Sequence, residues 1–194
     1  MTPAPRDRIL DATLTCVARV GLGKTTLDDV AREAGLARAT LYRYFPGKQP
    51  LISALVAREA ARLGADLLEA TAACRTLEDA VVELVTTAVA SLEAHAALQY
   101  VLLVEPEVLL PYLAFRRADD FLREASALVA PALEAFLPSD RVARAAEWLV
   151  RVVQSYACSP TAEVDLNDPV SVRVLVTEFV LPGLVPSNML GVTS

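Results

Sequence analysis

Apolar residues recur along this chain at steps of three and four residues, the spacing that places side chains on one face of an α-helix. In the first such stretch, residues 6–20, the apolar face contains Ile9, Ala12 and Cys16. Gly21 follows directly, and a glycine just beyond the last periodic residue is typical of a helix end. The pattern predicts an amphipathic helix at the beginning of the chain.

Two shorter helices are predicted next. Thr26 stands three residues before Asp29, which is the spacing of a capping box, where a hydroxyl and a carboxylate pair with free backbone amides. This helix ends near Gly35, and a third one covers residues 37–45. Two short helices joined by a tight turn that contains glycine are typical of a helix-turn-helix.

The helical spacing continues over the rest of the chain, with breaks at prolines, glycines and polar loops. The stretch 98–115 is irregular because Pro106 and Pro111 interrupt it. We expect an all-α protein of about nine helices, with a three-helix helix-turn-helix head in residues 1–50 and a larger helical body in residues 51–194. The helices predicted for the body cover residues 48–74, 76–92, 98–115, 116–136, 138–158 and 169–181.

Composition supports helices and limits the possible chemistry. Hydrophobic residues make up 54% of the 194 residues and only 7 are glycine, so the chain can bury a core and favours helix over sheet. Three well-separated cysteines and a single histidine exclude a zinc site built on several imidazoles and favour a reducing compartment. Because the first residues lack the apolar run of a signal peptide, we expect a cytoplasmic protein with no membrane partner, metal or cofactor.

Charge is distributed unevenly along the chain. The net charge is −6, yet residues 1–50 hold eight basic and five acidic side chains. The remaining residues hold ten basic and nineteen acidic side chains. A basic end on an acidic chain indicates a nucleic-acid contact at that end, and ordinary solvated faces are the alternative explanation.

Residues 23–51 read GKTTLDDVAREAGLARATLYRYFPGKQPL. The Thr-Thr start, Asp-Asp-Val-Ala, Glu-Ala-Gly and Thr-Leu-Tyr-x-Tyr-Phe followed by Lys48 resemble the DNA-binding head of the tetracycline-repressor (TetR) family of bacterial transcription regulators. The resemblance covers about residues 6–55. It implies a homodimer that binds double-stranded operator DNA through the head and a small ligand through the body. Ala37 departs from the family, in which a hydroxyl residue often caps the recognition helix, so we expect a weaker start of that helix.

The third helix separates a buried side from an exposed one. Leu41 and Phe45, one turn apart, should pack against the first two helices. On the opposite surface Arg38 can donate twice to a guanine, and the methyl group of Ala39 can contact a thymine. Hydroxyls, amide-rich helix starts and further basic groups suit backbone phosphates. The predicted DNA-binding residues are therefore Thr26, Arg38, Ala39, Thr40, Tyr42, Arg43, Tyr44 and Lys48.

The last two long helices carry more apolar surface than one side of a helix bundle needs. Residues 142–156 and 170–184 are apolar around more than one face. Pairing each helix with its symmetry mate would form a four-helix interface, as the family resemblance implies. A purely intramolecular core is the alternative. The predicted dimer residues are Ala145, Leu149, Val152, Val153, Tyr156, Val174, Val180 and Leu184.

The resemblance also implies an effector cavity in the leucine- and valine-rich body. Aromatic and leucine side chains of this region are candidates to line it, and each can equally belong to ordinary core. Glu105 and Glu107 would either neutralise a cationic ligand or lie exposed beside Pro106. The predicted lining residues, which suit a small apolar effector, are Tyr100, Leu103, Leu109, Tyr112, Phe115, Phe121 and Trp148.

We expect a transcriptional repressor that this effector releases from its operator. Two other functions stay open. A helical carrier for an apolar molecule, with a non-functional head, would lack salt-sensitive DNA binding. An enzyme would need a nucleophile beside a base, a phosphate loop or metal-ligand spacing, and the sequence contains none of these patterns.

Overall fold

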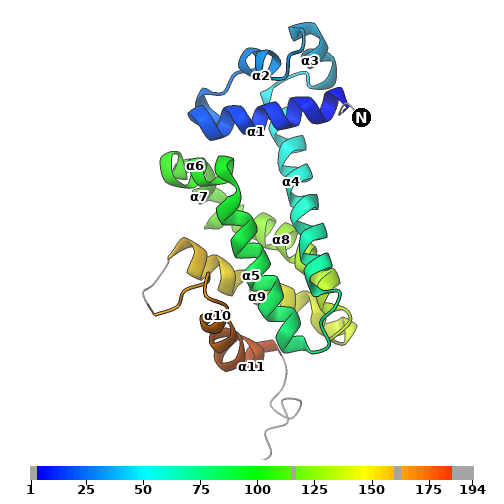
Figure 1. The fold of residues 1–194 in the computed structure, drawn as a ribbon, viewed down its shortest axis with the longest axis vertical. Coiled ribbons are helices and arrows are strands. Elements are labelled where there is room, and N and C mark those ends of the chain that lie inside the picture. Colours follow the sequence, from blue (N-terminus) through cyan, green and yellow to red (C-terminus); the bar gives the residue numbers. More distant parts are fainter. Residues whose placement is uncertain (1–3, 115–116, 160–162, 185–194) are drawn as a thin grey trace, which may run out of the picture. The chain divides into compact units, whose positions relative to one another are not determined.

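The computed structural model describes residues 4–114, 117–159 and 163–184 (Figure 1). Over these ranges the regular secondary structure is helical throughout, as the sequence predicts. The described helices, in chain order, are α1 (Pro5–Lys24), α2 (Leu27–Glu33), α3 (Arg38–Tyr44), α4 (Lys48–Thr71), α5 (Leu77–Ala94), α6 (Ala96–Val104), α7 (Pro106–Leu113), α8 (Ala118–Leu133), α9 (Ser139–Cys158), α10 (Pro169–Leu175), η2 (Val176–Val180) and α11 (Leu181–Leu184). The last three follow one another without a break and form one C-terminal helical segment.

The irregular stretch 98–115 contains parts of two helices rather than one. α6 ends at Val104, and Glu105 leaves the helical conformation with φ −130° and ψ 48°. Pro106 follows and begins α7. A residue that precedes proline is disfavoured in the helical region, because the proline ring clashes with its backbone. This break adds one helix to the nine that the sequence predicts.

The contacts of the chain define two compact units. Unit 1 comprises Met1–Ala61 and Leu92–Pro111, and unit 2 comprises Arg62–Ser91 and Tyr112–Ser194. This division differs from the expected boundary after residue 50. α6 packs on α1, so α6 and most of α7 belong to the same unit as the N-terminal helices.

Unit 1 is built around the core of the helix-turn-helix. Leu41 on α3 and Phe45, directly after that helix, lie in one buried cluster with Ile9 on α1 and Val30 on α2. Ile9, Val30 and Leu41 have no exposed surface. Burying a large apolar side chain stabilises the folded state by about 1.5–3 kcal/mol, so this cluster fixes how the three helices pack, as the sequence predicts.

α1 breaks at the glycine where the sequence predicts its end. Gly21 has φ 87° and ψ 167°, a conformation that glycine adopts readily and other residues avoid. Just beyond the break, the backbone N–H of Leu22 donates to Oε2 of Glu105 at 2.6 Å, and that of Gly23 donates to Oε1 at 3.0 Å. Glu105 is half-buried, and it anchors the end of α1 rather than lying free in solvent.

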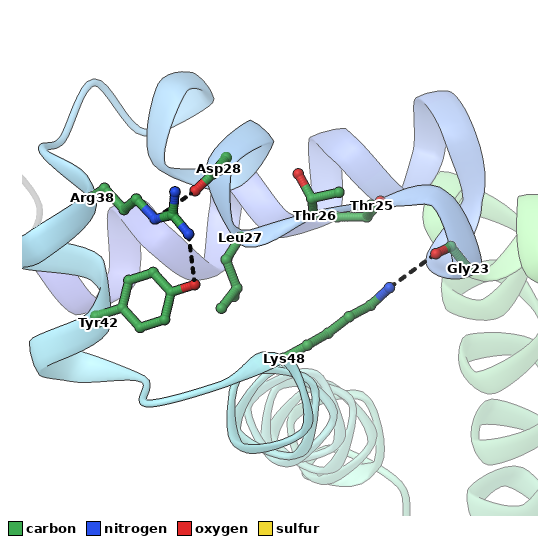
Figure 2. A pocket seen from close by; sticks show the side chains of 8 residues that line it. All are labelled: Gly23, Thr25, Thr26, Leu27, Asp28, Arg38, Tyr42 and Lys48. Atoms are coloured by element: carbon green, nitrogen blue, oxygen red, sulfur yellow. Dashed lines mark hydrogen bonds and ion pairs between the residues drawn. The ribbon is translucent and has the colours of Figure 1, made fainter.

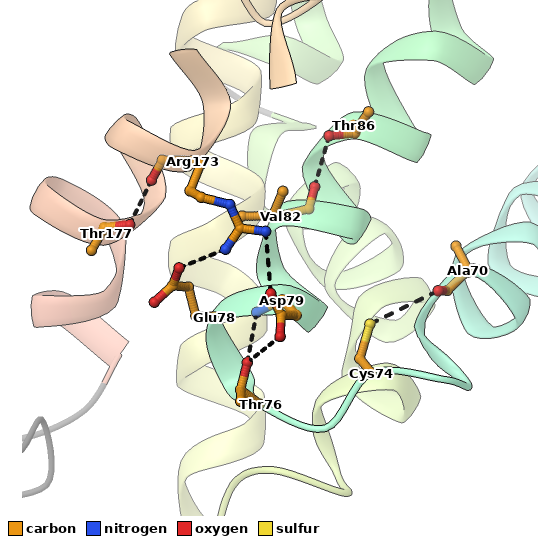
Figure 3. Close-up of polar contacts among 9 residues, drawn as sticks. All are labelled: Ala70, Cys74, Thr76, Glu78, Asp79, Val82, Thr86, Arg173 and Thr177. Carbon is orange, nitrogen blue, oxygen red and sulfur yellow. Dashed lines mark hydrogen bonds and ion pairs between the residues drawn. The ribbon is translucent and has the colours of Figure 1, made fainter. Parts of the chain in front are cut away.

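Unit 2 encloses an apolar core formed by α5, α8, α9, the C-terminal segment and the end of α4. A polar cluster on its surface joins the start of α5 to α10 (Figure 3). Thr76 Oγ1 accepts from the backbone N–H of Asp79 at 3.1 Å and donates to its carboxylate at 2.7 Å, so a hydroxyl and a carboxylate pair at the start of α5. Arg173 pairs with Glu78 at 2.6 Å and with Asp79 at 3.2 Å. The hydrogen bonds from Thr76 and Arg173 lower the pKa of the Asp79 carboxyl.

The described ranges hold no group of three or more His, Cys, Asp or Glu side chains placed to bind a metal ion. Within the same ranges no single helix is long and apolar enough to cross a bilayer, and only the bent pair of α5 and α6 passes that test when taken together.

Candidate nucleic-acid interface

The start of α2 is a complete capping box. Thr26 Oγ1 accepts from the backbone N–H of Asp29 at 3.2 Å, and the Asp29 carboxylate accepts from the N–H and hydroxyl of Thr26 at 3.3 Å and 2.5 Å. The side-chain hydrogen bond from Thr26 is the main reason why the pKa of Asp29 lies below its usual value, with smaller effects of the Thr26 amide and Arg32. The pair confirms the predicted cap and places Thr26, which is exposed, at the first turn of α2.

The turn between α2 and α3 depends on one glycine and one arginine. Gly35 has φ 62°, in the left-handed region that favours glycine. Arg8 Nη2 donates to the carbonyl oxygen of Ala34 at 2.6 Å and so ties α1 to this turn. α3 then begins after Ala37, which makes no side-chain cap. The weak helix start expected from alanine at this position is present.

α3 turns a basic and aromatic face to solvent. Leu41 is fully buried on the inner side, and Thr40 is half-buried. The guanidinium of Arg43 lies 5.7 Å from the ring centre of Tyr44. The predicted contact residues that are exposed on this helix are Arg38, Ala39, Tyr42, Arg43 and Tyr44.

Arg38 is held by two neighbours (Figure 2). Its Nε lies 3.0 Å from Oδ1 of Asp28 on α2, and its Nη2 donates to the hydroxyl of Tyr42 at 3.4 Å. The guanidinium also lies 5.3 Å from the centre of the Tyr42 ring, within the range of a cation–π interaction. The hydrogen bond to Tyr42 and the charge of Asp28 raise the pKa of Arg38. Asp28 did not emerge from the sequence, where it reads only as an acidic residue in the first turn of α2.

Lys48 closes the other side of the same surface. Its Nζ donates to the carbonyl oxygen of Gly23 at 3.1 Å, as Figure 2 shows. An open pocket lies between the start of α2, α3 and Lys48, and it brings together four of the predicted DNA-binding residues. It is lined by Gly23, Thr25, Thr26, Leu27, Asp28, Arg38, Tyr42 and Lys48.

The residues predicted to line an effector cavity are divided between the two units. Tyr100, Leu103 and Leu109 belong to unit 1, whereas Tyr112, Phe121 and Trp148 belong to unit 2; Phe115 lies outside the described residues. Leu103 is 79% exposed. A surface pocket between α8 and α9 contains none of the seven and is lined by Asp119, Leu122, Arg123, Ser126, Ala127, Ala130, Ala143, Glu147 and Arg151. The effector site stays a prediction.

The predicted dimer residues fall into two groups. Ala145, Leu149, Val180 and Leu184 are buried within unit 2 of the single chain, and the dimer interface stays a prediction. The other four retain exposed surface, and three of them pack against the edge of that core. They are Val152, Val153 and Tyr156, which are half-buried, and Val174, which is exposed. Further large exposed apolar side chains on α9, α10 and η2 are Trp148, Val170 and Phe179.

A helix-turn-helix whose second helix exposes arginines and tyrosines defines a class of DNA-binding protein. Residues 9–55 match the profile of the family described as bacterial regulatory proteins, tetR family. Residues 9–55 are therefore similar to the DNA-binding head of this family, and the chain as a whole resembles HTH-type transcriptional regulators.

Three similar proteins illustrate how far the likeness extends. An uncharacterized HTH-type transcriptional regulator of Mycobacterium tuberculosis (strain H37Rv) is 29% identical over 189 residues, which cover 96% of this chain and 89% of that protein. The HTH-type transcriptional repressor KstR of Rhodococcus jostii is 45% identical over 58 residues, 30% of this chain and 27% of KstR. The crystal structure of the TetR family repressor AlkX from Dietzia sp. superposes with a TM-score of 0.67 at 20% identity, over 92% of this chain and 96% of AlkX. This last match shows a shared fold.

Proposed function

We propose that this protein is a transcriptional regulator of the TetR family, that it represses transcription by binding a pseudo-palindromic operator as a homodimer in the cytoplasm, and that a small apolar ligand releases it. The observation that carries the proposal is the row of exposed side chains on α3, backed by the fully buried Leu41. A helix with such a face fits the major groove of B-DNA. The 45% identity to the repressor KstR over 58 residues supports repression.

The contacts are assigned by the chemistry of each exposed group. Arg38 and Ala39 read base edges, because a guanidinium donates twice to guanine and a methyl group fits the thymine methyl. Hydroxyl and ammonium groups bind phosphate oxygens and fix the register of the helix in the groove. The residues assigned to phosphates are Thr26, Thr40, Tyr42, Arg43, Tyr44 and Lys48.

A homodimer is supported by the apolar side chains that unit 2 leaves in solvent. Val170 is 70% exposed, Phe179 65% and Val174 49%. Burying such groups against a second copy removes apolar surface from water. A two-fold dimer places two recognition helices about 34 Å apart, one turn of DNA, or a multiple of it. Sedimentation should show a dimer for the natural chain and a monomer for Val174→Glu/Phe179→Glu.

The effector is proposed to be apolar because the body is rich in leucine and valine and because AlkX, a repressor of the same fold, is implicated in the biodegradation of n-alkanes. A ligand releases the operator only if it binds the released conformation more tightly than the DNA-bound one. A series of n-alkanes, added to the protein–DNA complex, tests this class. The alkanes that remove the shifted band should also be the ones that raise the melting temperature of the free protein.

The test of DNA binding is a mobility-shift assay on DNA from upstream of the gene. Arg38→Ala/Tyr42→Ala should abolish sequence-specific binding, whereas Arg144→Ala, an exposed arginine on α9, should leave it intact. The logarithm of the binding constant should fall with the logarithm of salt concentration by about 0.9 for each phosphate contacted. A folded double variant that still binds as tightly as the natural chain, or binding that ignores salt, would rule out the proposed interface.

A further inference from the structure

We propose that Asp28 determines sequence specificity: its carboxylate holds the Arg38 guanidinium in one orientation, so that the remaining edge of this group is presented to a guanine. The inference rests on the proposed function, because it requires Arg38 to enter the groove. It assigns to an acidic side chain a role in recognising a polyanion.

The geometry of the guanidinium supports this assignment. The group carries five N–H donors in one plane. In this structure Nε faces Oδ1 of Asp28 at 3.0 Å, and Nη2 donates to the Tyr42 hydroxyl at 3.4 Å (Figure 2). The contacts found for Arg38 among the described residues do not use Nη1. Nη1 and the second hydrogen of Nη2 form the end of the fork, which can pair with O6 and N7 of guanine.

Tyr42 also restricts the orientation of the Arg38 guanidinium. Arg38 and Tyr42 are four residues apart on α3, so their side chains share one face of the helix. The guanidinium lies 5.3 Å from the ring centre, and it is therefore held by Asp28 at Nε and by Tyr42 at Nη2 and at the face of the tyrosine ring. A long arginine side chain otherwise samples many rotamers, and it loses that freedom when it binds. Restraint in the free protein reduces this loss for the one orientation that suits guanine.

The charge of Asp28 affects specificity and affinity in opposite directions. A carboxylate on the DNA-facing surface repels phosphates of every sequence, so it weakens binding to all DNA. Its hydrogen bond to Arg38 also keeps this guanidinium from turning to a phosphate. Removal of the carboxylate should therefore strengthen binding to unrelated DNA and weaken the preference for guanine, two effects of opposite sign.

The experiment compares variants on the same duplexes. The natural chain is first used to enrich binding sequences from a random duplex library. Affinities at fixed salt are then measured for the enriched duplex, for its versions with each guanine replaced, and for a scrambled duplex. The variants are Asp28→Ala, Asp28→Asn, Arg38→Ala and Glu33→Ala. Glu33→Ala is the matched control, because it removes one negative charge from the same helix. Glu33 pairs with Arg19 and not with Arg38.

For the natural chain, replacement of one guanine should weaken binding about tenfold or more, and Arg38→Ala should remove that effect. Asp28→Ala should bind the scrambled duplex several-fold more tightly, while its preference for guanine falls at least about threefold. Asp28→Asn keeps an amide oxygen that accepts from Nε, so its preference for guanine should lie between those of the natural chain and of Asp28→Ala. Glu33→Ala should change both affinities by the same factor.

The outcomes distinguish failure of the role of Asp28 from failure of the proposed DNA interface. An unchanged preference for guanine in Asp28→Ala, with natural melting behaviour, overturns the role of Asp28 and leaves the proposed interface standing. Failure of the natural chain to enrich any sequence, or an Arg38→Ala variant with the full preference for guanine, overturns both.

Discussion

Gly21 and Glu105 fit closely together across the break in α1. A β-carbon added to Gly21 would lie 2.6 Å from Oε1 of Glu105 and 2.8 Å from the ring of Tyr100. The carboxylate approaches this near because it accepts from the backbone N–H groups of the next two residues. The break in α1 and Glu105, 84 positions later, therefore stabilise each other.

Replacement of Gly21 by alanine should destabilise the protein. The residue has φ 87° and ψ 167°, and such glycine-only conformations are strained for other residues by about 1–3 kcal/mol, to which the close contact with Glu105 adds. Urea denaturation should show the loss. Gly47→Ala is the control, because its added carbon would meet only Pro50, at 3.7 Å. Equal effects of the two substitutions would contradict this view of Gly21.

Glu105→Ala should lower the free energy of unfolding by about 1–3 kcal/mol, because two backbone N–H groups lose a charged acceptor. Glu107→Ala provides the comparison, since Glu107 is exposed two residues further along and should have little effect. Thermal melting of both variants measures the difference. If Glu107→Ala proves the more harmful, the anchoring role of Glu105 is wrong.

The capping box of α2 should make the free energy of unfolding fall at low pH. The pKa of Asp29 is lowered in the folded protein, so its contribution is present above the usual pKa of an aspartate, about 4, and is lost as the pH falls through the lowered value. Thr26→Ala should cost about 1 kcal/mol near neutral pH. Its difference from the natural chain should shrink in acid. Thr15→Ala, whose hydroxyl donates to the carbonyl oxygen of Asp11, should differ by an amount that does not change with pH.

Cys16 should resist thiol reagents until the protein unfolds. Its side chain is fully buried, and burial is the main cause of its raised pKa, so little reactive thiolate forms. Cys158 is exposed at the end of α9 and should react first. Counting modified thiols in Cys158→Ser, before and after addition of urea, measures this; rapid labelling of Cys16 in the folded protein would show that the α1 core opens easily.

Features set by neighbouring residues could be predicted from the sequence, and contacts between distant segments could not. The cap at Thr26 and the buried positions of Leu41 and Phe45 follow from spacing within a few residues. The contact of Glu105 with Leu22 joins residues 83 positions apart, and the pairing of Asp28 with Arg38 depends on how α2 and α3 cross. Neither leaves a periodic signal in the sequence.

The same distinction applies to the burial of the predicted dimer residues within the single chain. Periodicity shows that α9 is apolar on more than one face, but not which face the chain covers itself. Leu149 is 2% exposed, whereas Trp148, its neighbour, is 40% exposed. How α8 and the C-terminal segment pack against α9 decides which of the two is buried.

The backbone of Gly23 is held on both sides, its N–H by the carboxylate of Glu105 and its carbonyl oxygen by the ammonium of Lys48. Three helices, α1, α4 and α6, are thus tied together at a residue that has no side chain to pack. The stiffness of this junction comes from two opposite charges rather than from buried hydrocarbon. Amide hydrogen exchange at Gly23 should therefore be slow for so exposed a position, and ionic strength should change its rate more than it changes the rate in the core around Leu41.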